Sequence, residues 1–585
     1  MNVKANLSNH WVAIILAILV SVIVAFPQVL FRIEHKNDGI YQGIELLPDS
    51  PWSARVREIQ DGHGFGSIYY KDGKDDPYLH TPLGSMVVAY MGELFSLDIN
   101  NTILLSRLVL PFFAFLLIYI FVFLFSKNKF AALCSAAVIL LADSLLDYSG
   151  IPRFLGDTLQ GVSPSSFLEL ARPVYSLMIF IPFFAFLVSF WLFYQKRNWR
   201  WGAVSAVVLG LNFYNYFYIW TYLYAFGGIL VLIFLLQKKW QEAVRIAYVF
   251  LGALLVAIPY GWNLYRATLH PVYEDASLRY GIVLTHEPLF IGFIVIGALL
   301  VFFLGFPKED REKYFFGLAL LLTPLVTMNQ QLVTGMVLQT GHYHWYFHKP
   351  IAVIFVLIII FYLLTQRGWH SYKRILAVLI ISVSFAAGFF VQAASYFNDY
   401  DGRDGGYIAI ERQKYGPVMN WFSENAEKEA VVFANNETSH MTVIYTPLNV
   451  FHHRSAQLFL SATEERLLDA VFTLFRLRGV TRGDARETFI TNINQISADV
   501  YGIYYRESHG AYGVIPDEKF EEILERYEKT LLIPMPIWLH GMLKKYEVEY
   551  IVWDKIKDPL WKLDRFDYLN KVAEFGNIAI YRFSP

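Results

Sequence analysis

The stretch that decides the fold is polar, and residues 49–63 at its centre read DSPWSARVREIQDGH. It belongs to Arg32–Asn101, the longest polar interruption between apolar segments in the first two-thirds of the chain. Ser50 is a good N-cap, and Pro51 suits the first position of a helix because proline has no N–H to leave unpaired. We therefore expect a helix over 52–61, ended by the glycine that follows. Three apolar residues share one face of this helix: Trp52, Val56 and Ile59.

Asp49 is the candidate catalytic residue of this stretch. If Ser50 caps the helix, the Asp49 carboxylate lies one residue outside it and can face a cleft. The alternative is that Asp49 is itself the cap. Arg55 and Arg57 lie on the following turns, where a guanidinium could hold an anionic substrate near the acid.

The composition is that of a polytopic membrane protein with a substantial soluble part. Of the 585 residues, 55% are hydrophobic and only 17% are charged, against about 25% charged residues in soluble proteins. The net charge of -1 gives no sign of a nucleic-acid partner. The single cysteine, Cys134, lies in an apolar segment, so no disulfide can form within the chain.

Apolar segments long enough to cross a bilayer recur up to residue 396. The first, Trp11–Phe31, follows Lys4 and is long enough to predict an uncleaved anchor and not a signal peptide. Further segments bring the expected number of transmembrane helices to about eleven. They are Ile103–Phe125, Phe130–Leu146, Pro173–Tyr194, Trp201–Leu211, Phe217–Leu236, Ala243–Leu264, Pro288–Phe306, Tyr314–Val326, Lys349–Leu364 and Ile375–Tyr396.

Basic residues gather in alternate short connections, which predicts the topology. These connections are 127–129, 196–200, 238–239, 308–313 and 367–374. The positive-inside rule places them and the N-terminus on the cytoplasmic side of the membrane. We expect this membrane to be the plasma (inner) membrane. The long connections then share the outer face, together with everything after Asn398: 32–101, 148–172, 265–287 and 327–348. Functional residues are therefore expected on that face, on loops held by a rigid scaffold.

Two further segments complete the expected organisation. Pro82–Leu97 is too short and too polar to span and is expected to lie along the outer membrane surface. We divide the chain into a transmembrane domain, 1–397, and an extracytoplasmic α/β domain, 398–585. Strands of that domain are expected at Ala430–Ala434, Thr442–Tyr445, Val500–Tyr504, Val548–Trp553 and Ile578–Tyr581, with helices at Thr463–Leu477 and Lys519–Tyr527.

Two arginines at membrane edges are candidates for binding a phosphate. Arg172 ends an outer loop and is followed by Pro173, which restricts its backbone. An arginine there can grip a lipid-linked phosphate with two hydrogen bonds. The alternative is a side chain that extends to ordinary lipid headgroups. Arg279 is a second, weaker candidate of the same kind.

Amides, histidines and aromatic residues crowd the mouth of a later span, within 329–350. Polar groups at membrane depth are costly and tend to be functional. His344 and His348 are four apart, which leaves a metal site open, although Trp345 stands where the zinc-protease signature has Glu. We favour a wall that binds sugar or phosphate, and the alternative is an interfacial aromatic belt. The candidates for substrate contact are Gln339, His342, His344 and Trp345.

These features together resemble the GT-C superfamily of polyprenyl-phosphate-sugar-dependent membrane glycosyltransferases. That group includes protein O-mannosyltransferases, aminoarabinose transferases and oligosaccharyltransferase catalytic subunits. The points of likeness are the N-terminal span, the long outer loop with an acid just before a helix, the short cytoplasmic turns and the C-terminal outer domain. The tail 543–582 is also similar to the end of many such proteins. The likeness covers nearly the whole chain but rests on short motifs.

The resemblance implies a polytopic GT-C-like fold and transfer of a sugar from a polyprenyl-phosphate donor on the outer face. The acceptor would be a glycan, a lipid or a protein. In that family the first-loop acid contacts the acceptor or a metal, and Asp49 is the matching position. Arg172, with Arg279 or His342, would bind the leaving phosphate. Whether a divalent metal such as Mg²⁺ or Mn²⁺ takes part is left open.

The chain departs from the family pattern at two points, and two other functions stay open. Many members have a second acid where Ser50 stands, and the WWDYG signature is absent, so asparagine glycosylation is not expected. A transporter or flippase of lipid or polysaccharide would carry charges within its spans, and these spans have few. A membrane scaffold with an extracytoplasmic binding domain would not need Asp49 or the His342 segment.

Overall fold

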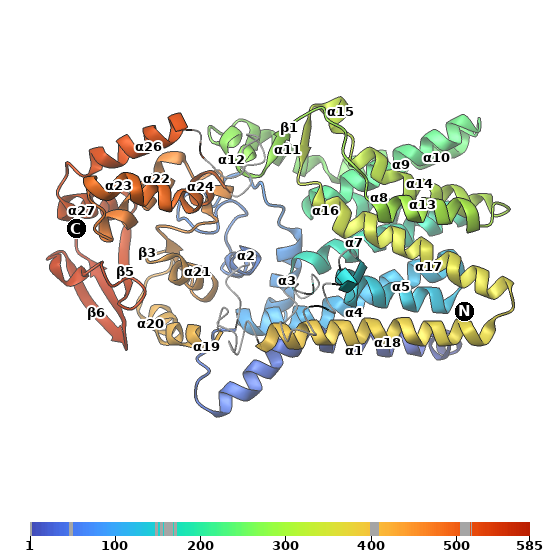
Figure 1. The fold of residues 1–585 in the computed structure, drawn as a ribbon, viewed down its shortest axis with the longest axis horizontal. Helices are drawn as coiled ribbons and strands as arrows, with labels where there is room; N and C mark the ends of the chain where they lie inside the picture. Colours follow the sequence, from blue (N-terminus) through green and yellow to red (C-terminus); the bar gives the residue numbers. More distant parts are fainter. Residues whose placement is uncertain are drawn as a thin grey trace.

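The computed structural model of the protein describes residues 3–45, 51–146, 150–152, 156, 168, 172, 174–397, 409–502, 515 and 517–585. The described residues form a helical bundle and, at one end of it, a C-terminal domain that contains a sheet (Figure 1).

Among the described residues, seven helices are long and apolar enough to cross a membrane. These candidate spans are His10–Asn37, Ile99–Ser126, Tyr175–Lys196, Phe217–Leu236, Arg311–Thr334, Gly341–Gln366 and His370–Ala394. A bent pair of helices, α10 (Trp240–Val256) and α11 (Ile258–Thr268), makes an eighth if the pair counts as one span. The expected polytopic helical membrane protein is confirmed.

The expected number of eleven spans is not confirmed. Three of the predicted segments form short helices in this structure: α5 (Lys129–Leu141), α8 (Trp199–Leu211) and α13 (Phe293–Gly305). Each has 13 residues, which at about 1.5 Å per residue is roughly 20 Å. The apolar core of a bilayer is about 30 Å thick, so these helices cannot cross it alone. Hydropathy reports how apolar a segment is, but a turn within it sets the length of the helix.

The bundle is built from long helices that pack pairwise. They are α1 (Val3–Asn37), α4 (Ile99–Ser126), α7 (Tyr175–Lys196), α9 (Phe217–Leu236), α14 (Arg311–Thr327), α17 (Lys349–Gln366) and α18 (His370–Ser395). α1 packs against α4 and α18, while α7 lies inside the bundle against α4 and α8. Phe183, Phe190 and Trp191 of α7 are fully buried. Aromatic side chains therefore fill the core of the membrane domain.

The two ends of the bundle differ in the residues that they carry. The five basic connections lie at the end that also holds the N-terminus, on the right in Figure 1. Contacts between these connections confirm the arrangement, since Arg197 pairs with Glu242 at 2.9 Å and Lys373 lies 5.5 Å from the Phe130 ring. The described parts of the connections 32–101, 265–287 and 327–348 and of the C-terminal domain lie at the other end (Figure 1). For these connections the charge alternation predicted correctly which loops share an end, and most of 148–172 lies outside the described residues.

The first long loop holds two helices between the bundle and the C-terminal domain. α2 (Pro51–Gln60) follows the predicted limits, and the predicted apolar face is confirmed because Val56 and Ile59 are buried. Gly62 has a φ of +85°, a conformation that favours glycine and that ends the helix. α3 (Leu83–Glu93) forms within the segment expected to lie on the membrane surface.

The C-terminal domain has a five-stranded sheet in the order β4-β3-β5-β7-β6. Its strands are β3 (Val431–Phe433), β4 (Asn449–Val450), β5 (Val548–Asp554), β6 (Leu569–Phe575) and β7 (Ile578–Phe583). β3 pairs in parallel with β4 and β5, while β5 with β7 and β7 with β6 are antiparallel. Its described helices are α19 (Ala409–Arg412), α20 (Gly416–Asn425), α21 (Asn436–Tyr445), α22 (Glu464–Leu477), α23 (Arg482–Thr491), α24 (Ile493–Tyr501), α26 (Asp517–Thr530) and α27 (Met535–Lys545). The predicted α/β class and three of the strands are confirmed.

One predicted strand is wrong, and a second is wrong over its described part. Thr442–Tyr445 forms the last turn of α21, because the Asn435 side chain caps this helix at Thr438 N. The β-branched Thr442 is accommodated by donating its hydroxyl to Thr438 O at 2.9 Å. The described part of the second segment, 500–502, includes the end of α24. At Thr442–Tyr445 the helix cap thus overrides the strand propensity of the segment.

Candidate functional site

An aromatic cluster lies where the first loop meets the bundle, at the end opposite the basic connections. It consists of Trp52, Tyr175, Tyr216, Tyr218 and His342. Trp52 of α2 stacks on Tyr175 at the start of α7, with ring centroids 4.8 Å apart and an interplanar angle of 23°. Tyr175 in turn meets the Tyr216 ring edge-on at 5.1 Å. The cluster therefore joins the first loop to the N-terminal ends of two apolar helices.

His342 is the polar centre of the aromatic cluster. Its Nδ1 hydrogen-bonds the hydroxyl of Tyr216 and lies 3.5 Å from the hydroxyl of Tyr175. The ring of Tyr218 lies 4.9 Å from the imidazole, and that of Trp345 lies 6.0 Å away. An imidazole held by two phenols in this way has a fixed orientation and can present its other nitrogen to a ligand.

Breaks in two helices create the site. Between α8 and α9 the chain forms a 3₁₀ turn, Asn212–Tyr214, which brings Tyr216 and Tyr218 to the end of the bundle. Before α17, a short helix α16 (Gly341–Tyr343) continues into a π-helix, His344–His348. π-helical turns are rare and often occur at functional sites, because the extra residue redirects the side chains.

Hydrogen bonds connect the broken helix to its neighbours. The Asn215 side-chain amide donates to Met178 O of α7 at 2.5 Å, and the Thr81 hydroxyl donates to Asn215 O at 2.5 Å. A narrow cavity lies among these segments beside the aromatic cluster. Its lining residues are Trp52, Thr81, Gly84, Val174, Tyr175, Met178, Ile179, Asn215 and Tyr216. The first loop is thus part of the wall of a cavity at the membrane domain.

Two of the predicted residues, Arg172 and Asp49, differ in whether the structure describes them. Arg172 is exposed, and its positive charge acts on Tyr175 and on His342. Arg172 and His342 are therefore close enough for the Arg172 charge to act on the imidazole. Asp49 lies outside the described residues.

Arg55 is buried between the first loop and the C-terminal domain. Its Nη1 donates to His80 O at 2.5 Å, and its guanidinium lies 5.7 Å from the Phe459 ring. Burial lowers the pKa of Arg55 to about 10. Burial and the nearby Arg55 charge lower the pKa of His80 to about 3, so this imidazole is neutral. Arg55 holds the loop in place with one charged hydrogen bond to a backbone carbonyl.

Arg279 lies at the end of α12 (Tyr273–Arg279) and is also buried. Its Nη1 donates to Ala462 O at 2.7 Å and to Gln457 O at 3.3 Å. Its Nη2 lies 4.0 Å from the Asp275 carboxylate. These contacts tie the connection between α11 and α13 to the C-terminal domain, so the guanidinium is engaged by protein groups.

The remaining predicted residues line the same end of the bundle. The Gln339 amide donates to Tyr280 O at 2.8 Å, next to a hairpin formed by β1 (Ile282–Leu284) and β2 (Met336–Leu338). His344 lies beside Gly292, where an added Cβ would be 3.2 Å from the imidazole. Trp345 is partly exposed.

The metal site left open by the two histidines has no further ligands among the described residues. His348 Nε2 lies 2.9 Å from the Thr327 hydroxyl, and the two imidazole centroids of His344 and His348 are 6.4 Å apart. Over the described ranges, no group of three or more His, Cys, Asp or Glu side chains could hold a metal ion.

A buried ionic network near the start of the first loop was not predicted. Glu45 accepts hydrogen bonds from Arg32 Nε and Gln28 Nε2, both at 2.6 Å, and its side chain is fully buried. Gln28 also accepts from Arg107 of α4 at 3.2 Å. The only indication of this network in the sequence is the presence of polar residues near the ends of two apolar segments. Polar side chains there are costly unless they find one another.

The aromatic partners of His342 were also missed. Tyr175, Tyr216 and Tyr218 lie in segments that read as apolar spans or as the short connection between them. The only available signal was the density of tyrosine and asparagine at 212–218, which is unusual inside a membrane domain.

Comparison with known proteins gives matches of structure alone. No protein-family model matches the chain, and no curated protein sequence matches it. The chain is similar to the crystal structure of the apo oligosaccharyltransferase of Archaeoglobus fulgidus, at 12% identity and a TM-score of 0.46, over 98% of this chain and 74% of that one. It is also similar to ArnT from Cupriavidus metallidurans bound to undecaprenyl phosphate, at 11% identity and a TM-score of 0.44, over 96% and 97% of the two chains.

Proposed function

We propose that this protein is a membrane glycosyltransferase that moves a sugar from a polyprenyl-phosphate-linked donor to an acceptor on the outer face of the membrane. The acceptor is a glycan, a lipid or a protein. The proposal combines the sequence resemblance with the position of the aromatic cluster. In this reading the basic end of the bundle faces the cytoplasm, as the positive-inside rule predicts.

The observation that carries the proposal is the hydrogen-bonded group of Tyr216 and His342 beside Trp52 of the first loop. Aromatic faces bind the apolar side of a sugar ring, and hydroxyl and imidazole groups bind its oxygens or a phosphate. The group lies at the end of apolar helices, where a lipid tail can lie alongside while its phosphate reaches polar residues. Polar side chains in such a position are expensive unless they line a wet site.

The proposed chemistry assigns one role to each of four residues. Asp49 takes the proton from the acceptor hydroxyl as its oxygen bonds to the sugar C1. The bond between C1 and the phosphate oxygen breaks, and its electron pair leaves on the polyprenyl phosphate. Arg172 stabilises the charge on that phosphate, and His342 hydrogen-bonds it. Trp345, at the edge of the cluster, would contact the sugar or the lipid tail.

Arg55, Arg279 and Gln339 receive supporting roles in this proposal. Each donates to backbone carbonyls and so fixes an outer loop. A binding site needs such support, since loops that carry reacting groups must be held within a fraction of an ångström. The requirement for a divalent metal is a matter for experiment, and loss of activity in EDTA with recovery on adding Mg²⁺ or Mn²⁺ would establish it.

The proposal is tested by following cleavage of a donor. The full-length protein in lipid vesicles is given a panel of polyprenyl-phosphate-linked hexoses and pentoses, and the release of polyprenyl phosphate is measured. We expect release with at least one donor, reduced at least about tenfold by His342→Gln, which replaces the imidazole that is held by Tyr216. The matched control is His286→Gln, an exposed histidine at the same end of the bundle.

Two results would contradict the proposal. One is equal release by the His342→Gln and His286→Gln proteins. The other is movement of intact lipid across the vesicle membrane without cleavage, which is the behaviour of a flippase.

A further inference from the structure

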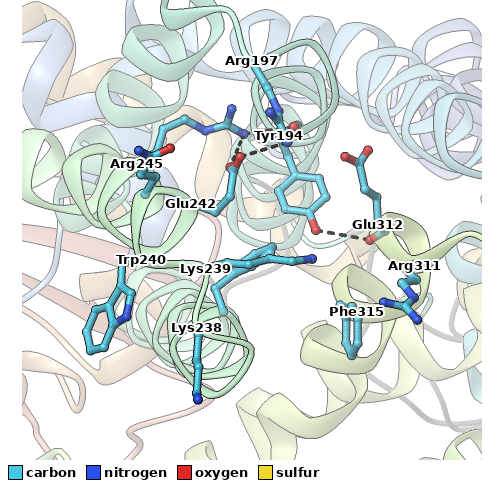
Figure 2. Close-up of a pocket in the computed structure, with 12 residues that line it drawn as sticks. Tyr194, Arg197, Lys238, Lys239, Trp240, Glu242, Arg245, Arg311, Glu312 and Phe315 are labelled. Atoms are coloured by element: carbon cyan, nitrogen blue, oxygen red, sulfur yellow. Dashed lines mark hydrogen bonds and ion pairs between the residues drawn. The ribbon is translucent and has the colours of Figure 1, made fainter.

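A cavity of ≈ 550 Å³ lies at the basic end of the bundle, far from the aromatic cluster (Figure 2). It is bounded by the end of α7, the turn between α9 and α10, and the start of α14. Five cationic side chains line it: Arg197, Lys238, Lys239, Arg245 and Arg311. Only two carboxylates, those of Glu242 and Glu312, line the same cavity. The lining therefore carries an excess of positive charge.

The arginines of one wall are fixed by protein contacts. Glu242 lies 2.9 Å from Arg197 Nη2 and 3.3 Å from Arg245 Nη2. Arg245 also donates to Tyr194 O at 3.1 Å, and its guanidinium lies 4.9 Å from the Phe193 ring. One carboxylate is thus shared by two arginines, and this wall stays positive after its ion pairs are formed.

Three other cations face the cavity without a carboxylate. In the described part of the chain, no ion pair joins Lys238, Lys239 or Arg311 to an acid. Figure 2 shows Lys239 reaching across the cavity toward α14, which carries Arg311. Lys239 Nζ lies 5.9 Å from the Phe234 ring. These three exposed cations line one cavity and leave it with an excess of positive charge, which attracts an anion.

The start of α10 adds a second attraction for an anion. Trp240 and Gln241, the first two residues of this 17-residue helix, line the cavity. No side chain among the described residues caps the helix at Lys239. The first N–H groups of α10 and the positive end of its helix dipole therefore lie at the same cavity as the lysines.

The surroundings suit a ligand in the membrane surface. The side chain of Trp240 is 63% exposed and that of Leu236 is 75% exposed. Tryptophan is typical of the boundary between the apolar core and the headgroups. A basic pocket between transmembrane helices on the cytoplasmic side is a common arrangement for binding anionic headgroups.

We propose that this cavity is a binding site for a phosphate group, carried by an anionic phospholipid or by a soluble phosphate compound. Lys238, Lys239 and Arg311 pair with the phosphate oxygens, and the N-terminal N–H groups of α10 donate to them. The site is independent of the proposed transfer reaction, because its residues lie at the opposite end of the bundle.

Two binding measurements on the purified full-length protein distinguish the two sources of phosphate. The first counts phosphatidylglycerol and phosphatidylcholine molecules that stay bound to the detergent-solubilised protein in native mass spectrometry. The second titrates the delipidated protein with inorganic phosphate in a calorimeter. A single phosphatidylglycerol retained in preference to phosphatidylcholine identifies a lipid headgroup site, and saturable binding of inorganic phosphate identifies a site for soluble phosphate.

The variant that tests the site is Lys238→Gln/Arg311→Gln. Its control is Arg200→Gln/Lys308→Gln, which removes two exposed cations at the same end that do not line the cavity. We expect the first pair to weaken retention or binding at least about tenfold, because two charges that contact the phosphate are lost. The control should bind as the wild type does, with both variants melting within a few degrees of it.

Equal binding by the two variants would overturn the proposal, since the attraction would then be that of a generally basic surface. Absence of both phosphatidylglycerol preference and phosphate binding in the wild-type protein would overturn it as well.

Discussion

Trp52 and Tyr175 stack face to face across the junction between the first loop and the membrane domain, with 4.8 Å between their ring centroids. Trp52 begins the helix that follows Asp49 in sequence, and Tyr175 begins the buried helix α7. This aromatic pair is therefore one of the contacts that fix where the loop meets the bundle. In the proposed function this pair sets the position of the catalytic loop relative to the phosphate-binding residues.

Replacing Trp52 tests this positioning role. Trp52→Ala removes the stack, which is worth about 0.5–1.5 kcal/mol beyond the area that it buries. We expect transfer to fall at least about tenfold, because small displacements of reacting groups slow reactions strongly. Trp52→Phe keeps a ring on Tyr175 and should retain most of the rate. The control is Trp262→Ala, which removes a tryptophan that is 62% exposed. A Trp52→Ala protein with wild-type kcat and KM would show that the stack has no part in transfer.

Replacing Glu45 tests the buried ionic network. Glu45→Gln leaves Arg32 without its charged partner at 2.6 Å. Removing one member of a buried pair typically costs about 3–5 kcal/mol, so the melting temperature should fall by several degrees. Glu525→Gln is the comparison, since that carboxylate pairs with Lys529 at the surface and exposed pairs contribute little. Equal melting temperatures for the two variants would show that the network does not stabilise the fold.

The contact between the first loop and the C-terminal domain should depend on pH through His63. Its Nδ1 lies 2.7 Å from Glu58, its Nε2 lies 3.0 Å from Glu429, and Lys74 pairs with both carboxylates. The hydrogen bond to Glu58 raises the pKa of His63 above its ordinary value of 6.5. Because the pKa of His63 is higher in the folded protein, the charged imidazole stabilises the fold fully below pH 6.5. This stabilisation is lost as the pH rises through the pKa of His63 in the folded protein.

The measurement is the difference in melting temperature between wild type and His63→Gln at several pH values. We expect the wild type to be more stable at pH 6, with the difference shrinking toward pH 8.5. A difference that stays constant, or that grows with pH, would contradict the assignment of a charged His63 between the two acids.

Arg172 should matter for binding of the donor more than for folding. Arg172→Ala removes a charged donor of hydrogen bonds, worth about 1.5–3 kcal/mol, or roughly ten- to hundredfold in affinity. The measurement is binding of a short-chain polyprenyl phosphate to the purified protein, with Arg172→Lys to separate charge from bidentate geometry. If the alanine variant binds this lipid as tightly as wild type, Arg172 contacts only ordinary headgroups.

Local signals in the sequence predicted the parts of the fold that depend on local interactions. Pro51 and Gly62 set the limits of α2, and the strand Val548–Trp553 is continuous and apolar. The alternation of basic loops predicted which connections share an end, since each loop carries its own charge. The strand predicted at Thr442–Tyr445 was wrong because Asn435, which lies outside that segment, caps a helix that includes it.

The candidate site could be predicted only where a residue's own position reveals its role. His342 and Arg172 stood out as polar residues at membrane edges. Arg279 stood out for the same reason, but its partners lie 178 and 183 residues away at Gln457 and Ala462. Such contacts are set by tertiary packing. A single sequence therefore identified unusual residues but not which of them point into a common cavity.

The central claim is that an acid just before α2 is the base for sugar transfer, and Asp49→Asn tests it most directly. Asparagine keeps the size of the side chain and caps a helix about as well as aspartate, so folding should be unaffected. With a donor that the wild type cleaves, polyprenyl phosphate release per enzyme should fall at least about a hundredfold, at an unchanged melting temperature. Release at the wild-type rate by a well-folded Asp49→Asn protein would contradict the claim and would move the base to another acid of the loop, Asp38 or Asp61 first.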